Sequence, residues 1–306
     1  MKLKHLIKSQ QLDQKLLYSL FKDADEIRSN LKKHNKDLKG KILTTLFYEP
    51  STRTRLSFES AMLKLGGNVI STENAREFSS AIKGESIIDT IRIVSEYSDC
   101  IVIRHYQEGT AEKASKVSNI PIINAGDGQG QHPTQALLDL YTIFRELGRL
   151  DNLKIVIIGD LKHGRTARSL CYLLGKFKDI DITFVSPENI KMKNDIKVYL
   201  TRHKVTFREE SNLNKNLPKA DVIYMTRIQR ERMSKEDYKI SNGEFIINKE
   251  SFKLVKPSSI IMHPLPHVEE IVLPLNIEQK DKRVAYFRQS ANGLYIRMAL
   301  LNHLLS

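Results

Sequence analysis

Cysteine is scarce in this chain of 306 residues, which contains only Cys100 and Cys171. The two lie far apart, and neither belongs to a CxxC or Cys/His spacing, so nothing indicates a disulfide framework or a metal site. We expect two buried thiols in a reducing compartment. Long apolar runs are also missing: no stretch approaches the roughly 18 uninterrupted apolar residues that a membrane span needs.

The first residues, MKLKHLIKSQQLDQ, are basic but lack the apolar segment and small-residue cleavage site of a secretory signal. We interpret them as mature sequence, and we expect a cytoplasmic location and no membrane partner. The formal net charge of +13 could suggest nucleic-acid binding. However, the lysines are scattered among acidic residues, and no RRM, KH or zinc-finger signature is present. A positive field also steers small anionic substrates, so we expect no nucleic-acid partner.

Apolar runs bounded by turn signals alternate with amphipathic stretches along the chain. We expect strands at 41–47, 100–104, 154–159, 181–185, 221–225 and 259–262, and helices at 53–65, 134–147, 165–177 and 294–304. This alternation predicts an α/β fold of two doubly wound domains, each a central parallel sheet flanked by helices. The segment 148–153 (GRLDNL) follows a long helix and is a candidate hinge between them.

The segment 47–58, FYEPSTRTRLSF, carries the strongest local signal. A strand ends at Phe47, and Ser51, Thr52, Arg53, Thr54 and Arg55 open a helix. A helix N-terminus offers unpaired N–H groups and a partial positive charge, which suit a phosphate. The simpler interpretation is a serine N-cap beside exposed arginines, but capping explains only one of the hydroxyls. The cluster therefore favours a phosphate site.

The segment 122–138, IINAGDGQGQHPTQALL, predicts a strand, a glycine-rich turn and a helix that begins near Pro133. His132 and Gln135 would stand at the start of this helix, near the carboxyl end of a sheet, where open α/β sheets bind ligands. A lone histidine is usually structural. The neighbouring glutamine and the glycine-rich crevice favour a functional one.

Four weaker signals remain. Lys83 follows two serines in a polar loop, for which a solvated loop is the simpler interpretation. The segment IGDLKHGRTARS lacks the GxGxxG fingerprint, which argues against a nicotinamide site, but its Arg165 and Arg168 could hold a carboxylate. YMTRIQRER places arginines after a strand at the same sheet edge. In MHPLPHVEE, prolines stiffen a loop whose carbonyls could face a ligand N–H group.

STRTR, HPTQ and HPLP in this order form a specific combination, and through them the chain resembles the aspartate/ornithine carbamoyltransferase family over nearly its whole length. The resemblance implies two α/β domains joined by interdomain helices. It implies a carbamoyl phosphate-binding domain at 1–134 plus 287–306, because the last helix returns to it, and an aspartate-binding domain at 150–286. No cofactor or metal is implied for this chain.

The resemblance also implies roles for individual residues. Those implied to bind carbamoyl phosphate are Ser51, Thr52, Arg53, Thr54, Ser79, Arg104, His132, Gln135, and the backbone carbonyls of Leu265 and Pro266. Those implied to bind aspartate are Lys83, Arg165, Arg227 and Gln229. Ser79 and Lys83 match residues that the family supplies from a neighbouring subunit, which implies a homotrimer with shared active sites. Some members also bind a zinc-containing regulatory chain.

The implied reaction is transfer of the carbamoyl group from carbamoyl phosphate to L-aspartate, an early step of pyrimidine (UMP) biosynthesis. Negative charge develops on the carbamoyl oxygen, where Thr54, Arg104 and His132 would stabilise it; one such donor can be worth about 3 kcal/mol. Arg53 and Lys83 would stabilise the leaving phosphate. No carboxylate is an obvious general base, so we hypothesise that the departing phosphate accepts the amine proton.

Three features favour aspartate as the acceptor. HPLP and TRIQ match the aspartate branch, whereas the ornithine branch carries HCLP, and an arginine-rich second domain would repel a cation. His267 departs from the family, which usually has arginine there. The alternatives are transfer to ornithine or another amino acid, and a non-catalytic chain that binds carbamoyl phosphate; the intact motifs argue against the second.

Overall fold

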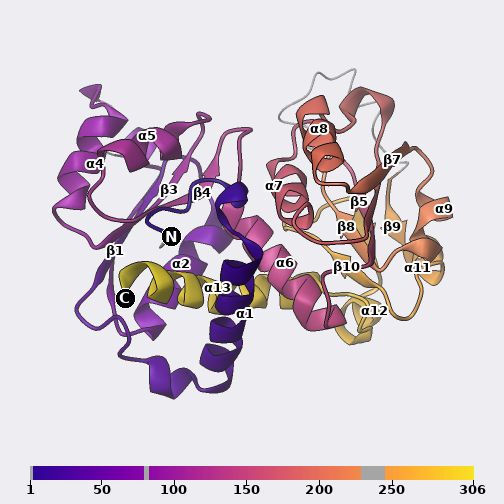
Figure 1. The fold of residues 1–306 in the computed structure, drawn as a ribbon, viewed down its shortest axis with the longest axis horizontal. Helices are drawn as coiled ribbons and strands as arrows, with labels where there is room; N and C mark the ends of the chain where they lie inside the picture. The colour runs from indigo at the N-terminus through magenta and orange to yellow at the C-terminus, as the bar shows by residue number, and fades with distance from the viewer. Residues whose placement is uncertain (1–2, 79–82, 229–244) are drawn as a thin grey trace. The chain divides into compact units, whose positions relative to one another are not determined.

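The computed structural model describes residues 3–78, 83–228 and 245–306, and the chain divides into two compact units. The first unit comprises residues 1–138 and 291–306, and the second comprises residues 139–290. Each unit is built on its own parallel sheet with helices on both faces (Figure 1). The predicted fold class is therefore confirmed.

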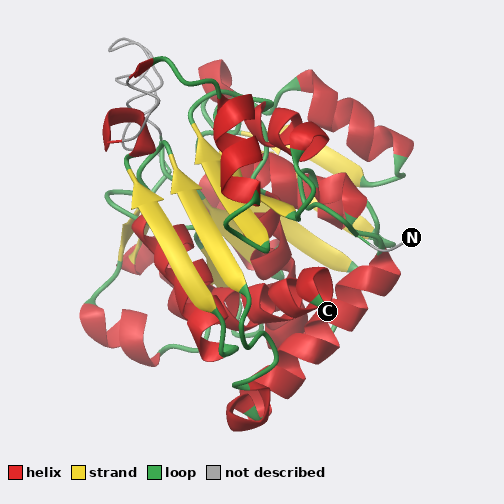
Figure 2. Cartoon of the chain, turned by 90° about the vertical axis from the view of Figure 1, so that its left-hand side faces the viewer, coloured by secondary structure: helices red, strands yellow, loops and turns green. Residues whose placement is uncertain are grey.

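The sheet of the first unit has four parallel strands in the order β2-β1-β3-β4. Figure 2 shows them running in one direction between helices. β1 and β3 are almost entirely buried, whereas the edge strand β2 is mostly exposed. Their bounds are Ile42–Phe47 for β1, Asn68–Glu73 for β2, Cys100–His105 for β3 and Ile122–Asp127 for β4.

The helices of this unit cover both faces of the sheet. α4 and α5 pack together on one face, and α2 lies on the other with the C-terminal helix α13, where the guanidinium of Arg297 stands 5.0 Å from the ring centre of Phe58 (Figure 1). The bounds are Ser9–Gln11 for η1, Gln14–Ser29 for α1, Leu31–His34 for η2, Thr52–Lys64 for α2, Ala75–Phe78 for α3, Ile87–Ser95 for α4, Thr110–Val117 for α5, Pro133–Leu147 for α6 and Tyr286–Leu305 for α13.

The sheet of the second unit has five parallel strands in the order β10-β8-β5-β6-β7, and a separate pair joins β9 to β11. The inner strands are apolar runs such as LKIVII in β5, as expected for strands covered on both faces. The bounds are Leu153–Ile158 for β5, Ile180–Val185 for β6, Thr206–Glu210 for β7, Val222–Met225 for β8, Ile247–Asn248 for β9, Ile260–Met262 for β10 and Ile271–Val272 for β11.

α7 and α8 lie on one side of this sheet and α9 and α11 on the other (Figure 1). The core on the α9 and α11 side joins Ile158, Ile223 and Met225 of the strands to Leu213 and Phe252 of the helices. The bounds are Arg165–Leu174 for α7, Glu188–Ile190 for η4, Asn194–Arg202 for α8, Leu213–Asn216 for α9, Leu217–Lys219 for η5, Lys249–Lys253 for α11 and Leu275–Lys280 for α12.

Both cysteines are free and fully buried. Burial raises the pKa of both thiols, that of Cys171 to about 12, so neither forms a thiolate near neutral pH. Within the described ranges, no helix has the length and apolar character needed to cross a membrane, and no cluster of His, Cys, Asp and Glu could hold a metal ion.

Candidate active site

The start of α2 is an uncapped helix N-terminus. Ser51 is the N-cap residue, with extended backbone angles of φ −161° and ψ 90°, but its side chain makes no capping hydrogen bond. The first turn contains no acidic residue, so no side chain of that turn offsets the partial positive charge of the helix end. The N–H groups that a capping side chain would otherwise satisfy are thus left for another acceptor, and a phosphate group suits them.

The two arginines of STRTR differ in their contacts. Arg55 donates to Glu73 Oε2 at 2.7 Å and to Ser71 Oγ at 3.2 Å, so it ties α2 to the edge strand β2. Arg53 is exposed and has no hydrogen-bond or ion-pair partner among the described residues. Of the two, only Arg53 can therefore turn its guanidinium to an anion at no cost to an existing ion pair.

Arg104 lies beside the end of β1, because the β1–β3 register pairs its Cα with that of Phe47. Its guanidinium donates to Glu49 Oε1 at 3.0 Å and to the Ala125 carbonyl at 3.2 Å. Only 11% of the Arg104 side chain is exposed. Glu49 belongs to the FYEPSTR segment, and no motif in the sequence predicted that it would contact this arginine. Register and ion pair together place the Arg104 guanidinium next to the loop that leads into α2.

His132 and Gln135 are both buried, at the start of α6. The Gln135 and Ala136 N–H groups donate to the His132 carbonyl, which fixes the first turn. The preceding glycine turn requires Gly128, whose φ is +51° and where a Cβ would come within 2.7 Å of the Tyr106 carbonyl oxygen. The turn thus packs closely on the loop after β3, and this brings α6 to the same sheet edge as α2.

Lys83 is exposed, near the start of α4. The structure therefore places it on the surface of the first unit. Ser79, whose role the resemblance also implies, lies outside the described residues.

In the second unit, groups that the resemblance implies as ligands of aspartate (Arg165 and Arg227) and of carbamoyl phosphate (Leu265 and Pro266) follow three adjacent strands. Arg165 begins α7 after β5 and is buried, Arg227 follows β8, and the loop with Leu265 and Pro266 follows β10. Glycine is required at position 159, directly after β5, because a Cβ there would lie 2.1 Å from the Thr226 carbonyl oxygen. Because the order is β10-β8-β5, these groups share one edge of the sheet. Gln229 lies outside the described residues.

Arg168 does not join this group. Its Nη1 donates to Asp195 Oδ1 at 3.0 Å and its Nη2 to Asp195 Oδ2 at 2.5 Å, a two-pronged ion pair that ties α7 to α8. The hypothesis that Arg168 helps to hold a substrate carboxylate is thus not favoured by its contacts. Arg165 is the better placed of the two.

His267, the departure from the family pattern, has a partner in the same unit. Its Nε2 lies 3.2 Å from Glu278 Oε1, and its ring packs edge-on against Tyr286. The Tyr286 hydroxyl donates to the same Glu278 oxygen at 2.5 Å. His267 therefore anchors the 263–268 loop to α12 through this carboxylate.

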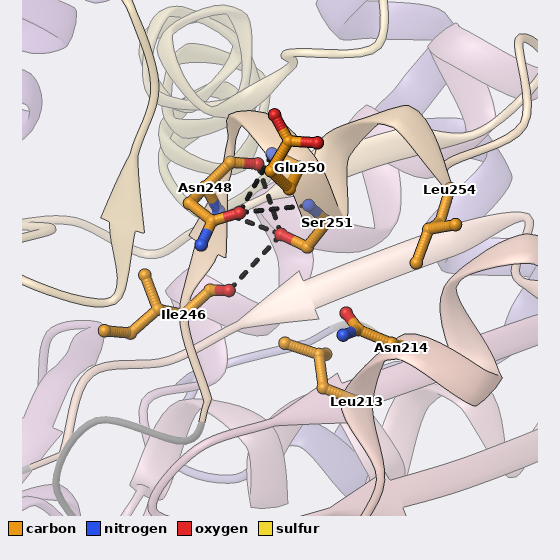
Figure 3. Close-up of a pocket in the computed structure, with 7 residues that line it drawn as sticks. All are labelled: Leu213, Asn214, Ile246, Asn248, Glu250, Ser251 and Leu254. Atoms are coloured by element: carbon orange, nitrogen blue, oxygen red, sulfur yellow. Dashed lines mark hydrogen bonds between the residues drawn. The ribbon is translucent and has the colours of Figure 1, made fainter.

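A hollow between α9 and α11 is lined by polar side chains, but several of them are already hydrogen-bonded within the protein (Figure 3). Asn248 Oδ1 accepts from the N–H groups of Glu250 and Ser251, and Ser251 Oγ accepts from the Asn248 N–H group. These bonds form a capping box for α11. Since the Asn248 and Ser251 side chains already serve the helix, we assign no ligand to this hollow.

Comparison with known proteins defines the class. The model of the aspartate/ornithine carbamoyltransferase carbamoyl-P binding domain matches residues 4–145, and that of the Asp/Orn binding domain matches residues 151–304. The chain therefore belongs to the aspartate/ornithine carbamoyltransferase family, as the motifs indicated.

Relatives at higher identity narrow the activity. The chain is 54% identical over 307 aligned residues to the chloroplastic aspartate carbamoyltransferase of Arabidopsis thaliana, covering 99% of this chain and 78% of that protein. It is 46% identical to the aspartate carbamoyltransferase catalytic subunit of Methanocaldococcus jannaschii, covering 99% and 98%. The predicted activity, aspartate carbamoyltransferase, is confirmed.

Solved structures agree. The catalytic subunit from M. jannaschii matches with a TM-score of 0.90 at 46% identity, over 99% of this chain and 98% of that one. The Trypanosoma cruzi aspartate transcarbamoylase in complex with carbamoyl phosphate and aspartate matches with a TM-score of 0.91 at 36% identity, over 100% and 98%.

One prediction is wrong. A cytoplasmic location was expected from the N-terminal residues, but the relatives from A. thaliana, Pisum sativum and Oryza sativa are chloroplastic enzymes. Charge and apolar patterning report on folding and solubility, and these are alike in a plastid and in the cytosol, so they could not distinguish the two compartments.

Proposed function

We propose that this chain catalyses attack of the L-aspartate amine on carbamoyl phosphate, giving N-carbamoyl-L-aspartate and phosphate, with the residues in the roles set out below. The observation that carries the proposal is the start of α2, where an uncapped helix end stands next to an exposed arginine that has no partner in the described part of the chain. Such an end attracts a phosphate through oriented N–H groups and the helix dipole.

The phosphate is bound by Ser51, Thr52, Arg53 and Thr54. Their backbone N–H groups and hydroxyls satisfy its oxygens, and the Arg53 guanidinium supplies charge. Ser79 adds a further hydroxyl. As the carbon–oxygen bond to phosphate breaks, the phosphate gains charge, and Arg53 and Lys83 stabilise it. The phosphate then takes the proton that the attacking amine loses.

The carbamoyl oxygen is stabilised by Thr54, Arg104 and His132. The amine of the carbamoyl group is held by Gln135 and by the backbone carbonyls of Leu265 and Pro266. Arg104 first has to leave Glu49, or share it, to reach the ligand. His132 and most of the Arg104 side chain are buried, which supports this role. Donors held in a site with little water stabilise a developing charge more than exposed donors do.

The aspartate carboxylates are clamped by Arg165 and Arg227, with Gln229 and Lys83 in support. The positions of both arginines after adjacent strands β5 and β8 support this pairing. Two guanidinium groups favour a dicarboxylate and disfavour the cationic side chain of ornithine.

The active form is a homotrimer in which Ser79 and Lys83 serve the site of a neighbouring subunit, and it works in a plastid. The exposed position of Lys83 supports the first statement, and the chloroplastic relatives support the second. A zinc-containing regulatory chain is a further candidate partner.

The clamp is tested by Arg165→Ala, with Arg168→Ala as the matched control on the same helix. Product is measured against aspartate concentration. We expect Arg165→Ala to lower kcat/KM for aspartate about a hundredfold, corresponding to about 3 kcal/mol for a charged hydrogen-bonded pair. Arg168→Ala should change it less than threefold, because Arg168 is engaged by Asp195. Equal losses in the two variants would contradict the assignment.

A further inference from the structure

Two titratable residues that the proposed chemistry does not use lie buried beside the 263–268 loop. His263 follows β10 and is 2% exposed, and Glu270 precedes β11 and is 8% exposed. The His263 Nε2 and Glu270 Oε1 atoms are 2.8 Å apart. Taking such groups out of water costs free energy, which their contacts in the fold must offset.

The surroundings define the tautomer of His263. The Leu265 N–H group donates to His263 Nδ1 at 2.8 Å, and a ring nitrogen that accepts a hydrogen bond carries no proton. The proton of the neutral ring is therefore on Nε2, the nitrogen beside the Glu270 carboxylate. The carboxylate selects the tautomer, and the tautomer makes Nδ1 an acceptor for the loop backbone.

Glu270 is suited to this task because it remains a carboxylate. Burial alone would raise its pKa, but the His263 imidazole and backbone N–H groups outweigh burial and lower the pKa below the usual value. Its oxygens also lie 3.3 Å from the Val268 nitrogen and 3.1 Å from the Glu269 nitrogen. One carboxylate thus holds the loop at its end directly and near its start through His263.

The loop needs such support at Leu265. Its φ of +53° lies in the left-handed region, which a leucine seldom adopts and which costs about 1–2 kcal/mol. The hydrogen bond to His263 Nδ1 holds the N–H group of this same residue. From the other side, the His263 N–H group donates to Gln289 Oε1 at 2.8 Å. The backbone orientation at Leu265 therefore depends on His263.

We propose that Glu270 and His263 are positioning residues for carbamoyl recognition: they hold the Leu265 backbone so that the carbonyls of Leu265 and Pro266 face the carbamoyl amine. This inference rests on the proposed function, which assigns those two carbonyls to the amine. It gives the buried pair a role, and it predicts that this role concerns the carbamoyl amine and not the phosphate. Inorganic phosphate has no amine, so its binding does not use the loop.

The experiment compares binding of carbamoyl phosphate and of inorganic phosphate to the intact oligomer by calorimetry. Glu270→Leu removes the acceptor beside Nε2, and we expect it to weaken carbamoyl phosphate about tenfold, the loss of about one hydrogen bond, and phosphate less than twofold. Glu270→Gln keeps an oxygen for the Nε2 proton and should restore most of the difference. The same order should appear in KM for carbamoyl phosphate.

Should Glu270→Leu fail to fold, two substitutions at His263 test the same chain of contacts. The amide oxygen of His263→Asn reaches about as far as Nδ1 and should keep the preference for carbamoyl phosphate over phosphate. His263→Gln places its amide near Nε2 instead and should lose it. Equal losses for both ligands, no loss for either, or the reverse order at His263 would overturn the inference alone. A wild-type enzyme without carbamoyl transfer would overturn the proposed function as well.

Discussion

Loss of Arg53 should weaken the binding of the phosphate group. Arg53 is exposed and lacks a partner in the described structure, whereas Arg55 is held by Glu73. In Arg53→Ala the phosphate loses one charge-assisted contact, worth about 1.5–3 kcal/mol in similar cases. If this contact strengthens as the phosphate leaves, kcat/KM for carbamoyl phosphate should fall about a hundredfold, since 1.36 kcal/mol corresponds to a factor of ten.

The fold should not suffer, because surface substitutions without partners usually change the free energy of unfolding by less than about 0.5 kcal/mol. Turnover and urea unfolding are measured on the same preparation. The matched control is Arg92→Ala on α4, whose side chain is 64% exposed and lies 4.0 Å from Asp89 Oδ1, at the limit of an ion pair. A less than threefold loss in Arg53→Ala, or the same loss in Arg92→Ala, would refute the assignment of Arg53 to the phosphate.

Subunit sharing and the half-buried carboxylate of Asp221 each lead to a further prediction. If Lys83 serves a neighbouring subunit, a mixture of Lys83→Ala and Arg53→Ala chains, dissociated and reassembled, should regain activity that neither variant has; no regain would contradict shared sites. Burial would raise the pKa of Asp221, but the Lys256 ammonium at 2.6 Å and the Lys154 N–H group outweigh it and lower the pKa. Because the folded-state pKa is below the unfolded value of about 3.9, this stabilisation is present above that pH and is lost as the pH falls through the folded-state pKa. Urea unfolding across this range should show a shallower acid loss for Asp221→Asn than for wild type, and parallel curves would contradict the cause given.

Much of the fold could be predicted because the inner strands are apolar runs. β1, β5 and β8 were expected within a residue or so of their observed bounds, since burial on both faces demands apolar side chains. The edge strands β2 (NVISTE) and β7 (TFREE) were missed because their exposed positions carry polar residues. The predicted helix 165–177 was too long. α7 ends at Leu174, because Gly175 forms its C-cap.

The motif residues could be read from the sequence, but their partners could not. Arg53 and Arg55 look alike in STRTR, as do Arg165 and Arg168 in RTAR. What separates them is Glu73 on a distant edge strand and Asp195 on another helix. The Glu49 contact to Arg104 likewise joins residues that are far apart in the chain. Such pairings are set by the tertiary fold, and local patterns do not contain them.

The central claim is carbamoyl transfer to aspartate, and the most direct test offers L-aspartate and L-ornithine in parallel to the purified oligomer with carbamoyl phosphate. The account predicts N-carbamoyl-L-aspartate and phosphate in equal amounts, and no product with ornithine. Product with ornithine, or none with either acceptor from a correctly assembled enzyme, would contradict it.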